Sequence, residues 1–143
     1  MVTKQISVFI ENRKGRLGDI LEVLRTGKVN ILSLSLADTA EYGLLRLIVD
    51  DPAKGKEKLA EAGFSCMVTD VFVVKVPHTP GSLQNILKTI SDEEISIEYM
   101  YGLSVGGEDA SIVVKTSDFD RACEVFQKKG IETLTADDLK LLA

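Results

Sequence analysis

The chain contains the segment QISVFIENRKGRLGDILEVLRTGKVNI (Gln5–Ile31), and a similar segment, VFVVKVPHTPGSLQNILKTISDEEISI (Val71–Ile97), follows 66 positions later without a gap. Identical residues fall in one β-rich run, one glycine turn, one helix face and the next β-rich run. The similarity then continues at a displacement of 67, so that Gly63 corresponds to Gly130. Because self-similarity at a fixed period indicates a repeated structural unit, the sequence predicts a tandem duplication.

Each copy predicts the order strand, helix, strand, strand, helix, strand. In the first helix of each copy, apolar residues recur at i, i+3, i+4 and i+7 and therefore share one face. We expect Asp51-Pro52 and Ser117–Asp120 to begin the second helices, and Gly27 to end the first helix in a left-handed conformation. The expected strands are 6–10, 29–36, 43–49 and 66–68 in copy one and 72–76, 95–105, 110–115 and 132–134 in copy two, with a small helix over 136–142.

The two copies predict an α+β protein with one domain over residues 1–70 and a second over residues 71–143. A unit of this size buries too little surface to be comfortably stable alone. Only Thr69 and Asp70 separate the last strand of copy one from the first strand of copy two. We therefore expect the copies to pack rigidly against each other, without a flexible linker.

Charge and hydropathy exclude two classes of partner. Residues 1–70 carry ten basic and ten acidic side chains, whereas residues 71–143 carry seven and twelve. Because a phosphate backbone attracts basic surfaces, this balance argues against nucleic acid. No apolar run approaches the roughly 18 residues that span a bilayer, and Met1–Gln5 lead directly into a strand without the apolar core of a secretion signal. We expect a cytoplasmic protein with no membrane partner.

Few residues offer catalytic or metal-binding chemistry. Cys66 and Cys123 are not at equivalent places in the copies and lack CxxC spacing, so we expect two buried thiols rather than a disulfide or a metal site. His78 is the only histidine, which leaves no His-rich metal site. The sequence contains no nucleophile with a matching His and acid, no metal-ligand cluster and no phosphate-loop motif. We therefore expect no enzyme activity, no metal and no cofactor.

The turn before the first helix of each copy is the candidate site. It contains Gly15 in copy one and Gly81 in copy two. A glycine at a helix start lets a ligand approach the backbone closely, and the free N–H groups there suit a carboxylate or phosphate. A plain strand-to-helix turn uses glycine equally well, so both interpretations stay open at this point.

The residues around these turns match a known pattern: a strand, Asn/Asp-x-Pro-Gly-x-Leu, an amphipathic helix and a Val-Asn-Ile strand opening. The pattern resembles the ACT domain. The matching residues are Asn12-Arg13-Lys14-Gly15-Arg16-Leu17 with Val29-Asn30-Ile31 in copy one, and His78-Thr79-Pro80-Gly81-Ser82-Leu83 with Ile95-Ser96-Ile97 in copy two. Tyr42–Asp51 also resembles that family's third strand leading into its second helix, so the resemblance covers nearly the whole chain twice.

The resemblance implies a fold and a class of ligand. The fold is ferredoxin-like, with two βαββαβ units side by side in one continuous antiparallel sheet and the helices on one face. Family members commonly bind amino acids at the seam between units and thereby regulate metabolic enzymes or transcription. Carried over by position, the ligand-binding residues are Asn12, Arg13, Gly15, Arg16, Leu17, Asn30 and Ile31 in copy one, and His78, Pro80, Gly81, Ser82, Leu83, Ser96 and Ile97 in copy two.

The chain departs from the pattern at the turns themselves. The usual acidic residue is Asn12 in one copy and His78 in the other, and the usual proline is Lys14 in copy one. The two turns therefore need not bind the same ligand. His78 is either a surface residue or a ligand contact, and Arg13, Arg16 and Arg46 are either solvated charges or partners of a carboxylate. The acidic run 92–94 is interpreted as a solvated helix end.

Two functions remain open from the sequence. The first is a non-catalytic regulatory module that binds an amino acid and acts on an enzyme or regulator in trans through ligand-shifted association. The second is a structural module that forms a homodimer without a ligand. Unpaired sheet edges favour a homodimer in either case.

Overall fold

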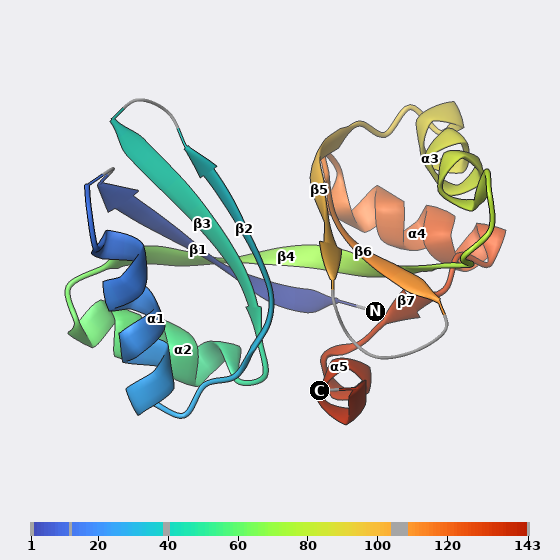
Figure 1. Cartoon of the computed structure of the whole chain (residues 1–143). Helices are drawn as coiled ribbons and strands as arrows, with labels where there is room; N and C mark the ends of the chain where they lie inside the picture. The colour runs from blue at the N-terminus through green and yellow to red at the C-terminus, as the bar shows by residue number, and fades with distance from the viewer. Residues whose placement is uncertain (1, 12, 39–40, 104–108, 143) are drawn as a thin grey trace. The chain divides into compact units, whose positions relative to one another are not determined.

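The computed structural model of the chain describes residues 2–11, 13–38, 41–103 and 109–142 (Figure 1). The order of strands and helices is the predicted one in both copies, followed by a short C-terminal helix. The elements are β1 Thr3–Glu11, α1 Arg16–Thr26, β2 Ile31–Asp38, β3 Tyr42–Val49, α2 Pro52–Glu61, β4 Ser65–Val76, α3 Ser82–Asp92, β5 Ile97–Leu103, β6 Ala110–Thr116, α4 Phe119–Lys129, β7 Thr133–Leu134 and α5 Ala136–Leu142.

The chain divides into two compact units. Lys4–Thr69 form the first unit, and the described residues from Asp70 onward form the second together with Val2 and Thr3. Strand order is β4-β1-β3-β2 in the first unit and β7-β4-β6-β5 in the second. This is the antiparallel ferredoxin-like arrangement, and in each unit both helices cover the same face of the strands (Figure 1). The predicted division into domains 1–70 and 71–143 stays a prediction.

The strand β4 differs from the prediction. The sequence predicted two strands separated by Thr69 and Asp70, but Ser65–Val76 form one strand of 12 residues. Neither residue forces a turn, and no glycine or proline interrupts the run, so the extended backbone continues. The strand therefore supplies the last strand of the first unit and the first strand of the second.

The strand registers repeat between the two units. Ile6 lies opposite Leu47 in the first unit, and Phe72 lies opposite Val114 in the second. Ile6 and Phe72 are 66 positions apart in the sequence, and Leu47 and Val114 are 67 positions apart, as the sequence comparison predicts. A register irregularity also recurs, between Ile31 and Ser33 in β2 and between Ile97 and Tyr99 in β5. The duplication is therefore preserved in the geometry of the backbone as well as in the residues.

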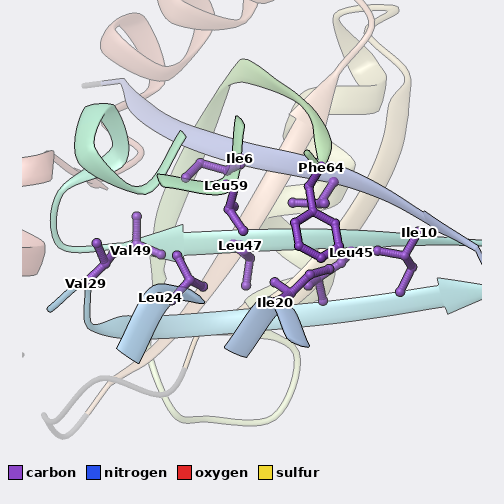
Figure 2. Close-up of a cluster of buried hydrophobic side chains, with 11 residues drawn as sticks. Ile6, Ile10, Ile20, Leu24, Val29, Leu45, Leu47, Val49, Leu59 and Phe64 are labelled. Atoms are coloured by element: carbon purple, nitrogen blue, oxygen red, sulfur yellow. The ribbon is translucent and has the colours of Figure 1, made fainter. Parts of the chain in front are cut away.

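The core of the first unit lies between its sheet and its two helices (Figure 2). Alternate residues of β1 and β3 point toward α1 and α2, and burying each such leucine or isoleucine contributes about 1.5–3 kcal/mol. The core of the first unit consists of Ile6, Val8, Ile10, Ile20, Leu24, Val29, Leu45, Leu47, Val49, Leu59 and Phe64. Of these, Ile6, Val8, Ile20, Leu45, Leu47 and Leu59 are fully buried.

The core of the second unit occupies the equivalent positions with larger aromatic side chains. Phe72 replaces Ile6 and stacks on Phe119, with ring centroids 4.7 Å apart and an interplanar angle of 11°. Phe126 replaces Leu59 and meets Phe72 edge to face, also at 4.7 Å. Aromatic pairs of this geometry add about 0.5–1.5 kcal/mol to the burial of their area. The two cores therefore share positions but not packing.

The second helix of each unit begins where the sequence predicted. Oδ1 of Asp51 accepts a hydrogen bond from the amide of Lys54 at 3.1 Å, and Oδ1 of Asp118 accepts one from Arg121 at 3.1 Å. Each aspartate satisfies one amide that the helix leaves unpaired at its start.

The end of α1 corrects a prediction. Gly27 has φ −76° and is not left-handed, whereas the next residue, Lys28, has φ 57°. The repeat places Glu94 at the same point, with φ 59°. A Cβ at Gly27 would lie 3.0 Å from Cγ of Lys58 on α2, so the lysine side chain would have to shift by a few tenths of an ångström to admit one.

The sequence also led to expectations about membrane-spanning helices, metal sites and the two cysteines. No described helix is long and apolar enough to cross a membrane. Among the described residues, no three histidine, cysteine or carboxylate side chains gather as a metal site. Cys66 and Cys123 are free thiols and half-buried rather than fully buried, and this burial raises the pKa of both thiols.

Candidate functional site

The turns before α1 and α3 have the same backbone geometry. Gly15 has φ 88° and ψ −10°, and Gly81 has φ 87° and ψ −8°. The hydrogen bonds that close the turns also correspond: Arg13 N to Glu11 O and Thr79 N to Pro77 O, both 2.8 Å, and Asp19 N to Gly15 O and Asn85 N to Gly81 O, both 3.0 Å.

Backbone conformation, rather than crowding, explains the glycine in both turns. A positive φ near 88° is costly for a residue with a Cβ. A Cβ built on Gly15 or Gly81 would meet nothing within 4 Å, so the space beside each glycine is open. Neither helix start is capped by a side-chain hydrogen bond from its N-cap residue. Both turns therefore present uncapped helix amides beside open space.

The first turn presents two arginines in different surroundings. Arg13 is exposed, and its Nε lies 3.5 Å from a carboxylate oxygen of Glu11. Arg16 lies with its guanidinium carbon 4.3 Å above the centre of the Phe64 ring. Its Nη1 is 3.9 Å from Asp19, while its buried Nε has no hydrogen-bond partner among the described residues. Asn12, also expected at this site, lies outside the described residues.

Packing on the aromatic ring of Phe64 therefore orients Arg16, a contact that no local sequence pattern indicates. Leu17 is half-buried against the core. Arg46 is not brought to the turn. It lies on β3 between Ser7 and Ser35, on the sheet face opposite the core.

The second turn lacks such a cation. His78 and Pro80 are both exposed. The hydroxyl oxygens of Thr79 and Ser82 are hydrogen-bonded to each other at 2.6 Å. Ser82 occupies the position of Arg16, so the two turns differ in charge.

The second half of the expected site lies at the start of β2 and β5, and hydrogen bonds fix its backbone. The amide of Asn30 donates to Oδ1 of Asp50 at 2.9 Å, and the amide of Asp50 donates to the carbonyl of Asn30 at 3.0 Å. Ser96 and Ser117 repeat this exchange at 3.1 Å and 2.9 Å. The side chains of Asn30 and Ser96 are exposed.

Asp50 and Ser117 are positioning residues that sequence reasoning missed. The available signal was their equivalent position, 67 residues apart, as the polar residue after the third strand of each copy.

A pocket of about 900 Å³ lies beside α3 and the start of β5 in the second unit. Its volume is within the range of small-molecule sites. Three of the seven residues expected in copy two line it, namely Leu83, Ser96 and Ile97, whereas His78, Pro80, Gly81 and Ser82 do not. The apolar part of the lining is Leu83, Leu87, Ile95 and Ile97.

Polar and charged side chains complete the pocket, and most of them were not predicted. Lys88 and Glu94 supply opposite charges, and Gln84 and Ser91 add hydrogen-bonding groups. Glu94 was interpreted as part of a solvated helix end; it is exposed, but it also lines the pocket in a left-handed conformation. Lys88 makes an ion pair with Asp92 at 2.8 Å on the helix surface.

Comparison with known proteins places this geometry in a family. The family model described as "ACT domain pair" matches residues 1–143. The crystal structure of protein BT0572 from Bacteroides thetaiotaomicron is 38% identical, with a TM-score of 0.92, and the match covers 98% of this chain and 96% of that one.

Two further solved structures share the fold alone. The regulatory subunit of aspartate kinase from Thermus thermophilus, in a ligand-free form, is 15% identical with a TM-score of 0.60, and the match covers 90% of this chain and 96% of that one. The equivalent subunit from Thermus flavus is 16% identical with a TM-score of 0.57, covering 90% and 94%. No match was found among curated protein sequences. The match of the family model over the whole length, together with the close likeness to BT0572, shows that the chain belongs to the ACT domain pair family.

Proposed function

We propose that the chain is a non-catalytic regulatory module that binds an amino acid in the pocket beside α3 and β5. The observation that carries the proposal is the lining of this pocket. It combines residues expected from the family pattern, Leu83, Ser96 and Ile97, with two opposite charges, Lys88 and Glu94. Binding there would change the association of the chain with an enzyme or regulator in trans.

The charges suit a zwitterion. The ammonium group of Lys88 would attract the ligand's carboxylate, and the carboxylate of Glu94 would attract its α-ammonium group. Lys88 is now paired with Asp92 in an exposed i,i+4 arrangement. Because such pairs contribute only about 0.3–0.5 kcal/mol, a ligand carboxylate can replace Asp92 at little cost.

The apolar lining suits an aliphatic side chain. Leu83 and Leu87 come from one face of α3, and Ile95 and Ile97 come from the run that leads into β5. Hydrogen bonds between Ser96 and Ser117 hold that run in place. The site is therefore supported on its strand side before a ligand arrives, which lowers the entropic cost of binding.

The first turn is proposed as a second, unequal site. The described residues expected at the first turn are Arg13, Gly15, Arg16, Leu17, Asn30 and Ile31. In the second unit, the proposed site extends from the pocket toward the turn at His78, Pro80, Gly81 and Ser82. Arg16 supplies a cation where the second copy has Ser82. A ligand at the first turn would therefore be more acidic than one at the second. The placement of either ligand at a seam between two units stays a prediction.

Thermal melting of the full chain with each of the twenty amino acids at millimolar concentration tests the proposal. A ligand selective for the folded state stabilises it by about 2.7 kcal/mol at 100 times its Kd, which raises Tm by several degrees. We expect aliphatic amino acids to produce the largest rise.

A matched pair of variants locates the site. Lys88→Met should abolish the ligand-induced rise, whereas Lys128→Met, at an exposed lysine on α4 of the same unit, should keep it. Unchanged Tm values with all twenty amino acids would contradict the proposal and leave the structural module as the better description.

A further inference from the structure

Three acidic side chains follow one another at the end of α3, and only the first two have a cation beside them. The carboxylate of Asp92 lies 2.8 Å from Nζ of Lys88. The carboxylate of Glu93 lies 3.8 Å from Nη2 of Arg121. Glu94 is exposed and lines the pocket, and no lysine, arginine or histidine among the described residues forms an ion pair with it. Glu94 therefore brings an uncompensated negative charge to the pocket.

The backbone at Glu94 has a conformation that suits glycine. Helices α1, α2, α3 and α4 all end on a hydrogen bond from an amide to the carbonyl five residues earlier, and the residue before that amide is left-handed. These bonds join Val29 N to Leu24 O, Phe64 N to Leu59 O, Ile95 N to Ile90 O and Ile131 N to Phe126 O, at 2.9–3.4 Å. The left-handed residue is Gly63 after α2 and Gly130 after α4, but it is Lys28 after α1 and Glu94 after α3. Because a left-handed backbone is costly for a residue with a Cβ, glutamate occupies position 94 at the expense of stability.

Two further polar groups of the pocket favour a ligand that donates hydrogen bonds. Oγ of Ser91 donates to the carbonyl of Lys88 at 3.1 Å, so its single proton is used and it offers the pocket only lone pairs. The ammonium group of Lys88 is already paired with Asp92, so a ligand carboxylate there exchanges one ion pair for another. A ligand ammonium group meets no such competitor at Glu94. The pocket therefore gains more from a ligand's ammonium group than from its carboxylate.

We infer that Glu94 is the specificity-determining residue of the pocket and that it selects a primary ammonium group on an apolar chain. The inference rests on the proposed function for the place of the site, and it ranks the two charged groups of the ligand: the ammonium group is required, whereas the carboxylate is dispensable. Aliphatic amines without a carboxylate therefore belong to the ligand class. Carboxylic acids of the same chain, which lack the ammonium group, do not.

Thermal melting of the full chain with three related probes tests this inference. The probes are leucine, isoamylamine, which is leucine without its carboxylate, and isocaproate, which is leucine without its ammonium group. We expect leucine and isoamylamine to raise Tm and isocaproate to leave it unchanged. The dependence of Tm on probe concentration gives the Kd of each.

Glu94→Gln removes the charge and keeps the size of the side chain. It should raise the Kd of isoamylamine about tenfold or more, because a hydrogen bond to a charged group is lost. Glu124→Gln is the matched control, since Glu124 is an exposed carboxylate on α4 of the same unit and outside the pocket lining. Its response to isoamylamine should equal that of the wild type.

Glycine at the two left-handed positions separates the strain from the binding. Glu94→Gly and Lys28→Gly should each raise the Tm of the free protein by about 2–4 °C, because both relieve the same backbone conformation. Only Glu94→Gly should lose the response to isoamylamine, because Lys28 lies on the first unit, away from this pocket.

The outcomes for the inference and for the proposed function differ. A rise in Tm with leucine but not with isoamylamine would overturn the inference and leave the proposed function standing. A rise with isoamylamine alone would support the inference and contradict an amino acid as the ligand. A full response to isoamylamine in Glu94→Gln, or a Glu94→Gly chain less stable than the wild type, would also overturn the inference. No response to any of the three probes would overturn the inference and the proposed function together.

Discussion

Asn30 and Asp50 are joined by two hydrogen bonds, one from each backbone amide, and these bonds tie the start of β2 to the end of β3. The acceptor for Asn30 is a side-chain carboxylate, so this tie depends on the identity of residue 50. Asp50→Ala should lower the free energy of unfolding by about 1 kcal/mol, the usual worth of one hydrogen bond. Chemical denaturation measures the change.

Asp50→Asn is the control for this tie, because its amide oxygen can still accept the bond from Asn30. It should lose less than half as much stability as Asp50→Ala. Equal losses in the two variants would show that the hydrogen bond is not the cause.

The glycines of the two turns should respond alike to substitution. Gly15→Ala and Gly81→Ala should each lower the free energy of unfolding by about 1 kcal/mol or somewhat more, because φ is 88° and 87° and only the backbone conformation is strained. Asparagine tolerates a left-handed conformation better, so Gly15→Asn and Gly81→Asn should lose less. A large difference between the two alanine variants would indicate that crowding, rather than φ, governs one of the turns.

Much of this fold could be predicted from the sequence, because the relevant signals are local or repeated. Two copies of the turn, helix and strand pattern predicted the order of elements, and the change of displacement from 66 to 67 predicted the strand registers. Asp51 and Asp118 predicted the helix starts because capping needs a side chain only three residues away. The prediction for Gly27 failed because residue patterns locate a helix end only to within one or two residues, and the left-handed residue is the next one, Lys28.

The candidate site was predicted less completely. Leu83, Ser96 and Ile97 lie in the repeated pattern and do line the pocket. Gln84, Lys88 and Ser91 lie on the polar side of an amphipathic helix, where no spacing distinguishes a pocket residue from a solvated one. The stacking of Arg16 on Phe64 joins residues 48 positions apart in the sequence and needs the folded core to bring them together.

Thr116 carries a buried hydroxyl that the repeat suggests is dispensable. The residue is 1% exposed and its Oγ1 has no hydrogen-bond partner among the described residues. The equivalent residue of the first unit is Val49, a member of the core. Thr116→Val should therefore raise the free energy of unfolding by about 1 kcal/mol, because the cost of burying an unpaired hydroxyl is removed at nearly constant volume.

The reverse exchange in the other unit checks the explanation. Val49→Thr should lower the free energy of unfolding by about 1–2 kcal/mol, because it buries a new hydroxyl in an apolar core. If Thr116→Val is neutral or destabilising, the hydroxyl of Thr116 has a partner that contributes to the fold.

Asp138 should make the C-terminal helix sensitive to acid. Its Oδ2 accepts a hydrogen bond from the amide of Thr135 at 2.9 Å, and its own amide donates to Oγ1 of Thr135 at 3.2 Å. The bond from the Thr135 amide is the main cause that holds the pKa of Asp138 below its ordinary value of 3.8. A carboxylate with a lowered pKa in the folded state stabilises that state above its unfolded pKa, and this contribution is lost as pH falls through the folded value.

The wild type should therefore be more stable than Asp138→Asn near neutral pH, and the difference in unfolding free energy should shrink as pH falls below about 4. Urea denaturation at pH values from 7 to 3 measures both proteins, and a difference that stays constant over this range would contradict the assignment of the effect to ionised Asp138.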